Sequence, residues 1–408
     1  MKRRYELGVL DLYPIAIMGK SIEDSPTVGV VLDENVDGDR LLNALNKTVK
    51  LFPLFKTKIV FDKGYYLEEN DKPILIFNED EYHKTFTWKK DTNDYPWKLS
   101  YFNNRILLKW CHTVTDGRGA QTFLGALLNI YYGVDYHIDP ELKLGLEPFV
   151  DKNEKGIPQK KQEKGFSTKE LEIDKSNVYT TCHILKCKTK DILALAKRSD
   201  ASPATVIPPL FSIALRKCMN QKRNVDFSIV IDARKPLEHK TMHNCIFSKE
   251  ITYIDRFDTM DFELVSTIYR TILNLAVEKE NVIKEATDNV NIIGFATKRK
   301  HKSIIKLMGK LFSLVLKNGS SDATFTYLGK IDYGEAVNKH IKEYIFASWT
   351  DFGYCNIAAT DFNGEFTLMI NEDYKNKEVI PEFINTAKEL GLQINQVDTF
   401  KYYRDDIK

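Results

Sequence analysis

The sequence has no long apolar run and no closely paired cysteines. No stretch reaches the roughly eighteen apolar residues that a membrane-spanning helix needs, so we expect no such helix. The first residues, MKRRYELGVLDLYP, are basic at the start, like a secretory signal. Asp11 and Pro14 interrupt the apolar segment that a signal peptide requires, so we do not expect one.

The sequence also has little net charge. Lysine and arginine number 59 and aspartate and glutamate 57, which gives a net charge of +2. This balance predicts no general attraction to nucleic acid or to an anionic membrane, so an acidic ligand would need a local basic patch. The six cysteines are scattered through the chain without a C-x-x-C pair. Scattered cysteines are typical of reduced thiols, and we therefore expect a cytoplasmic protein.

Length and patterning predict two lobes. Single hydrophobic cores stop growing at about 250–300 residues, and this chain has 408. Both halves mix strand-like and helix-like segments without strict βαβ alternation, which indicates an α+β fold. A charged stretch that is poor in aliphatic residues lies near the middle. We therefore expect an N-terminal lobe over 1–160, a linker over 161–176 and a C-terminal lobe over 177–408.

Several segments in the second lobe predict individual elements. PATVIPPLFSIALRKCM (203–219) has the composition of a buried helix, and VDFSIVIDAR (225–234) is a continuous apolar strand with polar residues at its end. DFELVSTIYRTILNLAVEKEN (261–281) predicts one long helix.

The stretch WCHTVTDGRG (110–119) places a histidine between a strand and a helix. The apolar RILLKWC precedes His112, and Asp116-Gly117 forms a turn signal before the helical GAQTFLGALL. A neutral imidazole at such a position can take a proton from an alcohol, amine or thiol. Asp116 has two open roles, orienting the ring or pairing with a distant arginine. The same pattern is also typical of a partly buried histidine in an ordinary turn, and this interpretation stays open as well.

Two other chemistries for this stretch are disfavoured. A metal site would need His112 and Asp116 on one helix with a third ligand, but Gly117 and the preceding strand argue against that helix. We therefore expect no metal. A nucleophilic pair of Cys111 and His112 is disfavoured because successive strand side chains point to opposite faces, and a distant base for Cys111 stays open as an alternative.

Two further segments carry charge. In IVIDARK (229–235) the apolar strand delivers Asp232 and Arg234 to its polar end, on the same face because they are two residues apart. Arg234 would suit either an ion pair with a carboxylate from the other lobe or a local surface pair. The basic run KRKHK (298–302) fits a solvated helix start or a contact to the phosphates of an acidic cofactor.

Taken together, these segments resemble the coenzyme A-dependent acyltransferase superfamily. This superfamily includes chloramphenicol acetyltransferase, peptide-synthetase condensation domains, BAHD plant acyltransferases and alcohol acetyltransferases with their polyketide-associated relatives. CHTVTDG is similar to its H-H-x-x-x-D-G motif, and FSIVIDARK to a strand that ends in Asp-x-Arg. Asn244 in HNCIFS matches an asparagine that often follows, and TYLGKID (326–332) resembles the Asn-Leu-Gly strand of the alcohol acetyltransferase branch. The resemblance spans nearly the whole chain.

The resemblance implies a fold and a set of site residues. The fold would be two chloramphenicol-acetyltransferase-like lobes, each a mixed sheet with flanking helices, arranged in a V with a tunnel between them. His112 would be the general base, Asp116 and Gly117 structural, and Arg234 the partner of Asp116 that couples the lobes. Cys111 stands where the motif has its first histidine, and Tyr327 where the branch often has asparagine. The substrate-contacting residues would be Cys111, Asp232, Asn244, Tyr327 and Gly329.

The implied reaction is acyl transfer from a coenzyme A or phosphopantetheine thioester to a hydroxyl or amine, without an acyl-enzyme. Acyl-CoA or acyl-phosphopantetheine would be a co-substrate, with no permanently bound cofactor and no nucleic acid partner. We expect a monomer that binds a small acceptor and an acyl thioester, with an acyl carrier protein as a further partner to test. Two alternatives stay open: a condensation-type enzyme that forms amides on a carrier protein, and a non-catalytic binding module on the same fold.

Overall fold

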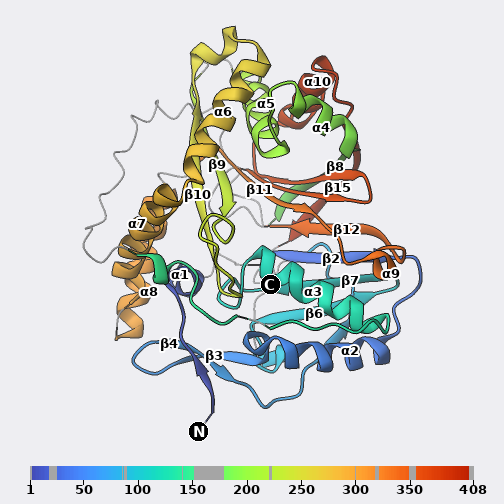
Figure 1. Ribbon diagram of the computed structural model, residues 1–408, viewed down its shortest axis with the longest axis vertical. Helices are drawn as coiled ribbons and strands as arrows, with labels where there is room; N and C mark the ends of the chain where they lie inside the picture. Colours follow the sequence, from blue (N-terminus) through green and yellow to red (C-terminus); the bar gives the residue numbers. More distant parts are fainter. Residues whose placement is uncertain are drawn as a thin grey trace.

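Three sheets organise the molecule, and two of them are large (Figure 1). The computed structural model describes residues 2–17, 25–84, 86, 90–139, 141–150, 179–219, 223–298, 300–317, 321–348 and 355–403. The predicted linker 161–176 lies outside these residues, so the division into 1–160 and 177–408 stays a prediction.

The upper lobe in Figure 1 is built on a seven-stranded mixed sheet. Its strands, in spatial order, are β10 (Ile246–Tyr253), β9 (Val225–Asp232), β11 (Ala323–Lys330), β13 (Cys355–Phe362), β14 (Glu365–Glu372), β8 (Tyr179–Lys188) and β15 (Asn395–Tyr403). β11 runs parallel to both β9 and β13, and the other pairs are antiparallel. The helices of this lobe are α4 (Thr189–Lys197), α5 (Pro203–Lys217), α6 (Phe262–Ala276) and α10 (Val379–Glu389). The buried α5 and the strand β9 confirm two of the sequence predictions.

The lower lobe holds the five-stranded sheet and a small three-stranded one. The five strands, in spatial order, are β12 (Ile341–Ala347), β2 (Thr27–Leu32), β7 (Arg105–Trp110), β6 (Trp97–Phe102) and β5 (Ile76–Asn78). The small sheet consists of β1 (Arg4–Tyr5), β4 (Tyr65–Glu69) and β3 (Thr57–Phe61). The helices α2 (Gly38–Leu51) and α3 (Gly117–Tyr131) pack together in this lobe, and the short α9 (Glu335–Asn338) precedes β12.

One strand crosses between the halves of the sequence. β12 comes from the C-terminal half but pairs antiparallel with β2 at the edge of the five-stranded sheet. Its Tyr344, Ile345 and Phe346 are buried in the same hydrophobic cluster as the N-terminal strands. The lower lobe is therefore completed by residues that lie far away in sequence.

A third group of helices lies at the left of Figure 1. α1 (Val9–Ile17) packs against both α7 (Lys279–Thr297) and α8 (Lys302–Lys317). The single long helix predicted over 261–281 is wrong, because α6 ends at Ala276 and α7 begins at Lys279. Val277 and Glu278 form the break, and Glu278 has the extended backbone conformation of a helix N-cap.

The two-lobed α+β prediction is confirmed, because each large sheet is mixed and flanked by helices. Two separate clusters of buried hydrophobic residues fill the lobes, and a smaller third one involves α7. Among the helices of the described segments, none is long and apolar enough to cross a bilayer.

Candidate active site

His112 lies in the turn that joins β7 to α3. β7 ends at Trp110, and the turn is closed by the amide of Val114, which donates to the carbonyl of Cys111 at 3.0 Å. The imidazole is half-buried and lies edge-on to the Trp110 indole, with ring centroids 6.0 Å apart. The strand and the tryptophan therefore fix the direction in which the histidine leaves the sheet.

Asp116 ends this turn and starts α3. Its carboxylate caps the helix by accepting from the Gly119 amide at 3.1 Å. Gly117 follows it without a side chain, and a β-carbon there would lie 3.1 Å from the Leu328 methyl of β11. The glycine therefore allows the start of α3 to approach the strand of the other lobe closely.

Arg234 joins Asp116 from the other lobe, as predicted. Its guanidinium makes two contacts with the Asp116 carboxylate, at 2.8 and 3.0 Å, and the amide of Cys245 donates to the same carboxylate at 3.0 Å. Asp116 is only 1% exposed. Burial alone would raise the pKa of its carboxyl, but Arg234 outweighs burial and holds this pKa below its usual 3.8. Asp116 therefore stays ionised and acts as a structural link between the lobes.

A second buried carboxylate, Asp11 of α1, supports the turn from behind. It accepts from Nδ1 of His243 at 2.7 Å and from Nδ2 of Asn244 at 2.6 Å. Asn244 also donates from Nδ2 to the backbone carbonyl of His112. The His112 backbone is thus connected through one amide to a buried ion pair.

Burial alone would lower the pKa of His243, but its attraction to Asp11 raises this pKa above the usual 6.5. The raised pKa favours the imidazolium, and when His243 is protonated the pair joins two opposite charges in a site where both side chains are 1% exposed.

His112 opens into a cavity of about 210 Å³ between the two large sheets. The N-terminal half contributes Pro26, Trp110, His112, Gly117 and Arg118; the rest of the wall is Val230, Asp232, Ile246, Thr324, Thr326, Tyr327, Leu328, Phe346, Ser348 and Asn356. The Arg118 guanidinium Nε lies 3.6 Å from an Asp232 carboxylate oxygen in this wall. A histidine at the junction of two lobes, in a cavity with few charges, is suited to proton transfer on a bound small molecule.

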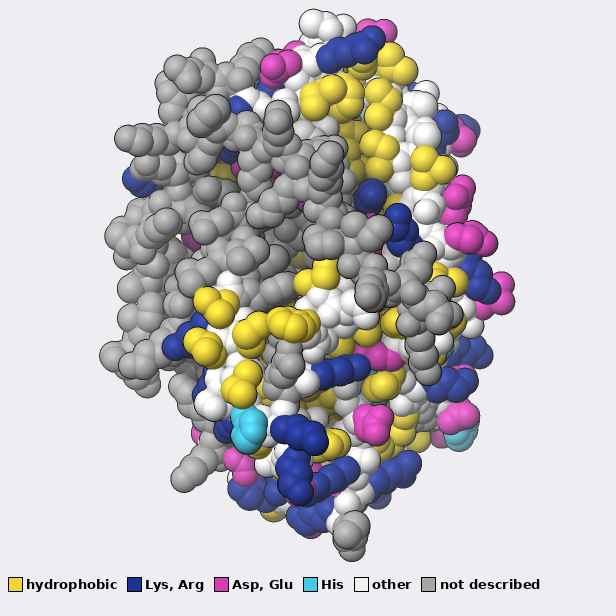
Figure 2. All heavy atoms as spheres, turned by 90° about the vertical axis from the view of Figure 1, so that its left-hand side faces the viewer, with side chains coloured by type: hydrophobic (Ala, Val, Ile, Leu, Met, Phe, Trp, Pro, Cys, Tyr) yellow, Lys and Arg dark blue, Asp and Glu magenta, His cyan; other side chains and the backbone are white. Residues whose placement is uncertain are grey.

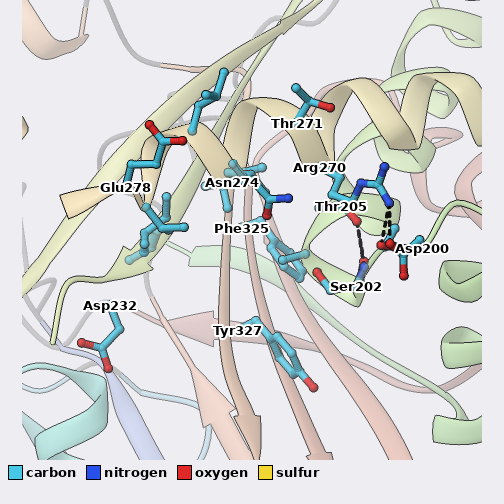
Figure 3. A pocket seen from close by; sticks show the side chains of 18 residues that line it. Asp200, Ser202, Thr205, Asp232, Arg270, Thr271, Asn274, Glu278, Phe325 and Tyr327 are labelled. Atoms are coloured by element: carbon cyan, nitrogen blue, oxygen red, sulfur yellow. Dashed lines mark hydrogen bonds and ion pairs between the residues drawn. The ribbon is translucent and has the colours of Figure 1, made fainter. Parts of the chain in front are cut away.

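A larger cavity of about 780 Å³ adjoins the first and shares Val230, Asp232 and Tyr327 with it. Figure 3 shows Arg270, Thr271 and Asn274 on α6 above Phe325 and Tyr327 of β11. Burial raises the pKa of the Tyr327 hydroxyl to about 12, so this side chain is a neutral phenol at the boundary between the two cavities.

The structure brings four of the predicted site residues, His112, Gly117, Asp232 and Tyr327, to the small cavity. Cys111 lies behind it instead, fully buried, with its thiol 3.2 Å from the Thr113 hydroxyl. Asn244 is likewise 4% exposed and contacts the His112 backbone.

Gly329 has a positive φ of 81° on β11, where a register shift interrupts the pairing with β13. Residues with a side chain rarely adopt this left-handed backbone conformation, which explains why a glycine stands at this point of the strand.

Sequence reasoning missed three kinds of residue. Arg118 directly follows the motif. Thr324 and Thr326 lie two residues apart on β11 and therefore point to the same face, so the sequence did indicate these three positions. Phe346 carried none, because it reaches the cavity from β12, the strand that crosses lobes. Asp11 and His243 are 232 residues apart and form no sequence motif. In the part of the chain that the structure describes, no group of three His, Cys, Asp or Glu side chains could hold a metal ion.

Solved structures resemble this chain over nearly its full length. TRI101 of F. sporotrichioides, solved with coenzyme A and T-2, is similar with a TM-score of 0.66 and 10% identity, covering 97% of this chain and 100% of that one. Polyketide synthase associated protein 5 from Mycobacterium tuberculosis gives a TM-score of 0.62 at 10% identity, covering 92% and 94%. The condensation domain of the Monacolin K polyketide synthase MokA gives 0.61 at 10%, covering 95% and 96%. Comparisons with protein-family models and with curated protein sequences find no match. At this identity the chain shares the fold of these proteins.

Proposed function

We propose that this protein transfers an acyl group from a coenzyme A or phosphopantetheine thioester to a hydroxyl or amine acceptor. One observation carries the proposal: His112 faces an interlobe cavity on a turn that the buried Asp116–Arg234 pair ties to the other lobe. The similar structures support it, because one of them was solved with coenzyme A and a second small molecule. The residues that hold the turn in place lie behind it, which leaves the imidazole facing the cavity.

His112 would act as a general base in a single displacement. Its imidazole takes the proton of the acceptor hydroxyl or amine as that oxygen or nitrogen attacks the thioester carbonyl. The tetrahedral intermediate collapses with cleavage of the C–S bond, and the imidazolium returns the proton to the leaving thiolate. No bond forms between enzyme and acyl group, so both substrates must be bound together before reaction.

Replacing His112 with Ala tests this mechanism. General-base catalysis contributes on the order of 10²- to 10⁴-fold, so the rate of transfer from an acyl-CoA should fall by about that factor. The melting temperature should stay close to that of the wild type, because the ring is half-buried and its backbone contacts remain. The exposed His137 offers the matched control, since His137→Ala should keep full activity. Wild-type turnover by His112→Ala would exclude His112 as the base.

The form of the donor is a separate question. The condensation domain of MokA has the same fold, and that similarity supports testing a carrier-bound donor beside free acyl-CoA. Purified protein should be given an acyl-CoA or the same acyl group on a carrier protein, with a mixture of alcohols and amines, and the products identified by mass spectrometry. Product from free acyl-CoA supports the alcohol acetyltransferase-like reaction. Product from the carrier-bound donor alone supports the condensation-type reaction, and thioester binding without any product supports the non-catalytic binding module.

A further inference from the structure

The segment between Asp288 and Asp322 has an unusual charge pattern that the acyl-transfer site does not use. It contains seven lysines and arginines and no acidic residue, although the whole chain is almost neutral. The segment covers the end of α7 and all of α8. The described lysines of this segment therefore lie on or beside one group of helices at one side of the molecule.

Large apolar side chains are exposed on the same helices. Phe295 and Leu307 are 64% and 58% exposed. We define the α7–α8 face as the apolar Ile292, Phe295, Ile304, Leu307 and Leu311 together with the exposed Lys298, Lys300, Lys302, Lys306 and Lys310. Figure 2 looks at the side of the molecule where α7 and α8 lie and shows hydrophobic side chains next to lysine and arginine side chains there.

The helical period explains how α8 presents both kinds of side chain outward. Lys302, Lys306 and Lys310 are four residues apart and form one row, and Ile304, Leu307 and Leu311 form a neighbouring row. Ile305 and Gly309 point inward and are buried. At Gly309 the backbone of α8 comes against the backbone of Ala16 in α1, too close for a side chain. α8 is therefore held against the protein by its inner face, and its outer face is apolar along one row and basic along the next.

A bilayer with anionic headgroups matches this combination. Amphipathic helices that lie in the membrane interface bury apolar side chains at the headgroup boundary while lysines contact acidic lipids. An acidic protein would complement the charge as well, but the strongly exposed Phe295 and Leu307 beside the lysines are the arrangement that enters a headgroup region. The apolar side chains of the α7–α8 face project from two helices, and the two cavities next to His112 are lined by other residues.

We propose that the α7–α8 face binds the surface of membranes that contain anionic phospholipids. Leu307, Leu311 and Phe295 enter the headgroup region, and the lysine row of α8 contacts the acidic headgroups. The whole protein thereby attaches reversibly to the bilayer surface. This proposal does not rest on acyl transfer, since none of these residues lines a cavity next to His112.

Vesicle co-sedimentation with the full chain tests the proposal. Vesicles of phosphatidylcholine alone are compared with vesicles of mixed phosphatidylcholine and phosphatidylglycerol. The wild type should bind the mixed vesicles at least about tenfold more tightly, and added salt should weaken the binding. The double variant Leu307→Ser/Leu311→Ser and the triple variant Lys302→Glu/Lys306→Glu/Lys310→Glu should each lose about tenfold or more in affinity for the mixed vesicles.

Two exposed leucines elsewhere give a matched control. Leu193 and Leu264 are 48% and 51% exposed, close to the 50% of Leu311, but lie on α4 and α6. Leu193→Ser/Leu264→Ser should bind the mixed vesicles like the wild type. All variants should keep the wild-type melting temperature, because the replaced side chains are on the surface.

Three outcomes would overturn the proposal. The wild type could fail to bind mixed vesicles, it could bind neutral vesicles equally well, or the control variant could lose as much affinity as the α8 variants. The same variants should also be tested against a purified acyl carrier protein. If they lose affinity for the carrier protein while vesicle binding is absent, the α7–α8 face is a protein-docking surface and the lipid proposal is wrong.

Discussion

Two buried aspartates, Asp116 and Asp11, hold the His112 turn, and they differ in the partner that balances their charge. Asp116 pairs with Arg234, whose guanidinium is charged at every ordinary pH. Asp11 pairs with His243, whose imidazole can lose its proton. Both carboxylates are 1% exposed, so each needs its partner. The first link therefore keeps both charges at every pH above the acid range, and the second depends on pH near neutrality.

Breaking the Asp116–Arg234 link should have the largest effect on stability. Arg234→Ala leaves the buried Asp116 carboxylate without its cation, and breaking such a pair costs about 3–5 kcal/mol. The free energy of unfolding from urea titration should fall by about this amount, and acyl transfer should be lost because the turn is no longer tied to the other lobe.

The control for this variant is Lys217→Ala. Lys217 pairs with Glu389 at 2.8 Å and with Glu382 at 3.0 Å, and its side chain is 38% exposed, so its loss should cost about 0–1 kcal/mol. Equal destabilisation by the two variants would contradict the structural role of Arg234.

The pH-dependent link should have an intermediate effect. The folded-state pKa of His243 is raised above its usual 6.5, so the stability from its charge is fully present below about that pH. This stability is lost as pH rises through the raised pKa. The link of Asp116 behaves oppositely, because its pKa lies below 3.8 and its contribution is lost only in acid.

Asp11→Asn isolates this dependence. The variant keeps the shape of the side chain but removes the charge, which should cost about 1.5–3 kcal/mol at acidic to neutral pH. Unfolding curves for wild type and variant at several pH values should converge as pH rises through the His243 titration. A difference in stability that is the same at all these pH values would show that His243 carries no charge in the folded protein.

The smallest effect should come from the amide between the Asp11 pair and the turn. Asn244→Ala removes the side-chain hydrogen bonds to the His112 carbonyl and to the Asp11 carboxylate and should cost about 1–2 kcal/mol of stability, with kcat reduced by roughly tenfold or less. The control is Asn281→Ala, which removes a comparable hydrogen bond from a side-chain amide to the Leu275 carbonyl at an exposed position. If both variants behave like the wild type in turnover, Asn244 does not position the histidine.

The sequence predicted one of these links and missed the other for a physical reason. Asp116 precedes a predicted helix, and Arg234 ends an apolar strand. Both patterns are recognisable in the sequence, so a pairing across the lobes could be proposed. Asp11 was interpreted only as a charge that interrupts an apolar segment. In the structure it is buried in α1 because His243 and Asn244 surround it. A pairing between residues so far apart depends on how the lobes pack, and no local pattern records that.

Local sequence patterns likewise predicted only part of the fold. Alternating and continuous apolar segments predicted strands such as β9 and the buried helix α5, because period and burial are local properties. The break between α6 and α7 was missed because Ala276, Val277 and Glu278 are residues that a helix tolerates. The pairing of β12 with β2 was also out of reach, since strand composition does not name the sheet that a strand joins.

The crossing of β12 has a consequence for how the protein is made on the ribosome. β2 is synthesised early, but the neighbour that covers its edge, Ile341–Ala347, emerges only after most of the chain. Until then the N-terminal half carries an open strand edge, which is a surface prone to pairing with other chains. Truncated or stalled nascent chains that end before Ile341 should therefore aggregate or recruit chaperones more than the 408-residue chain does.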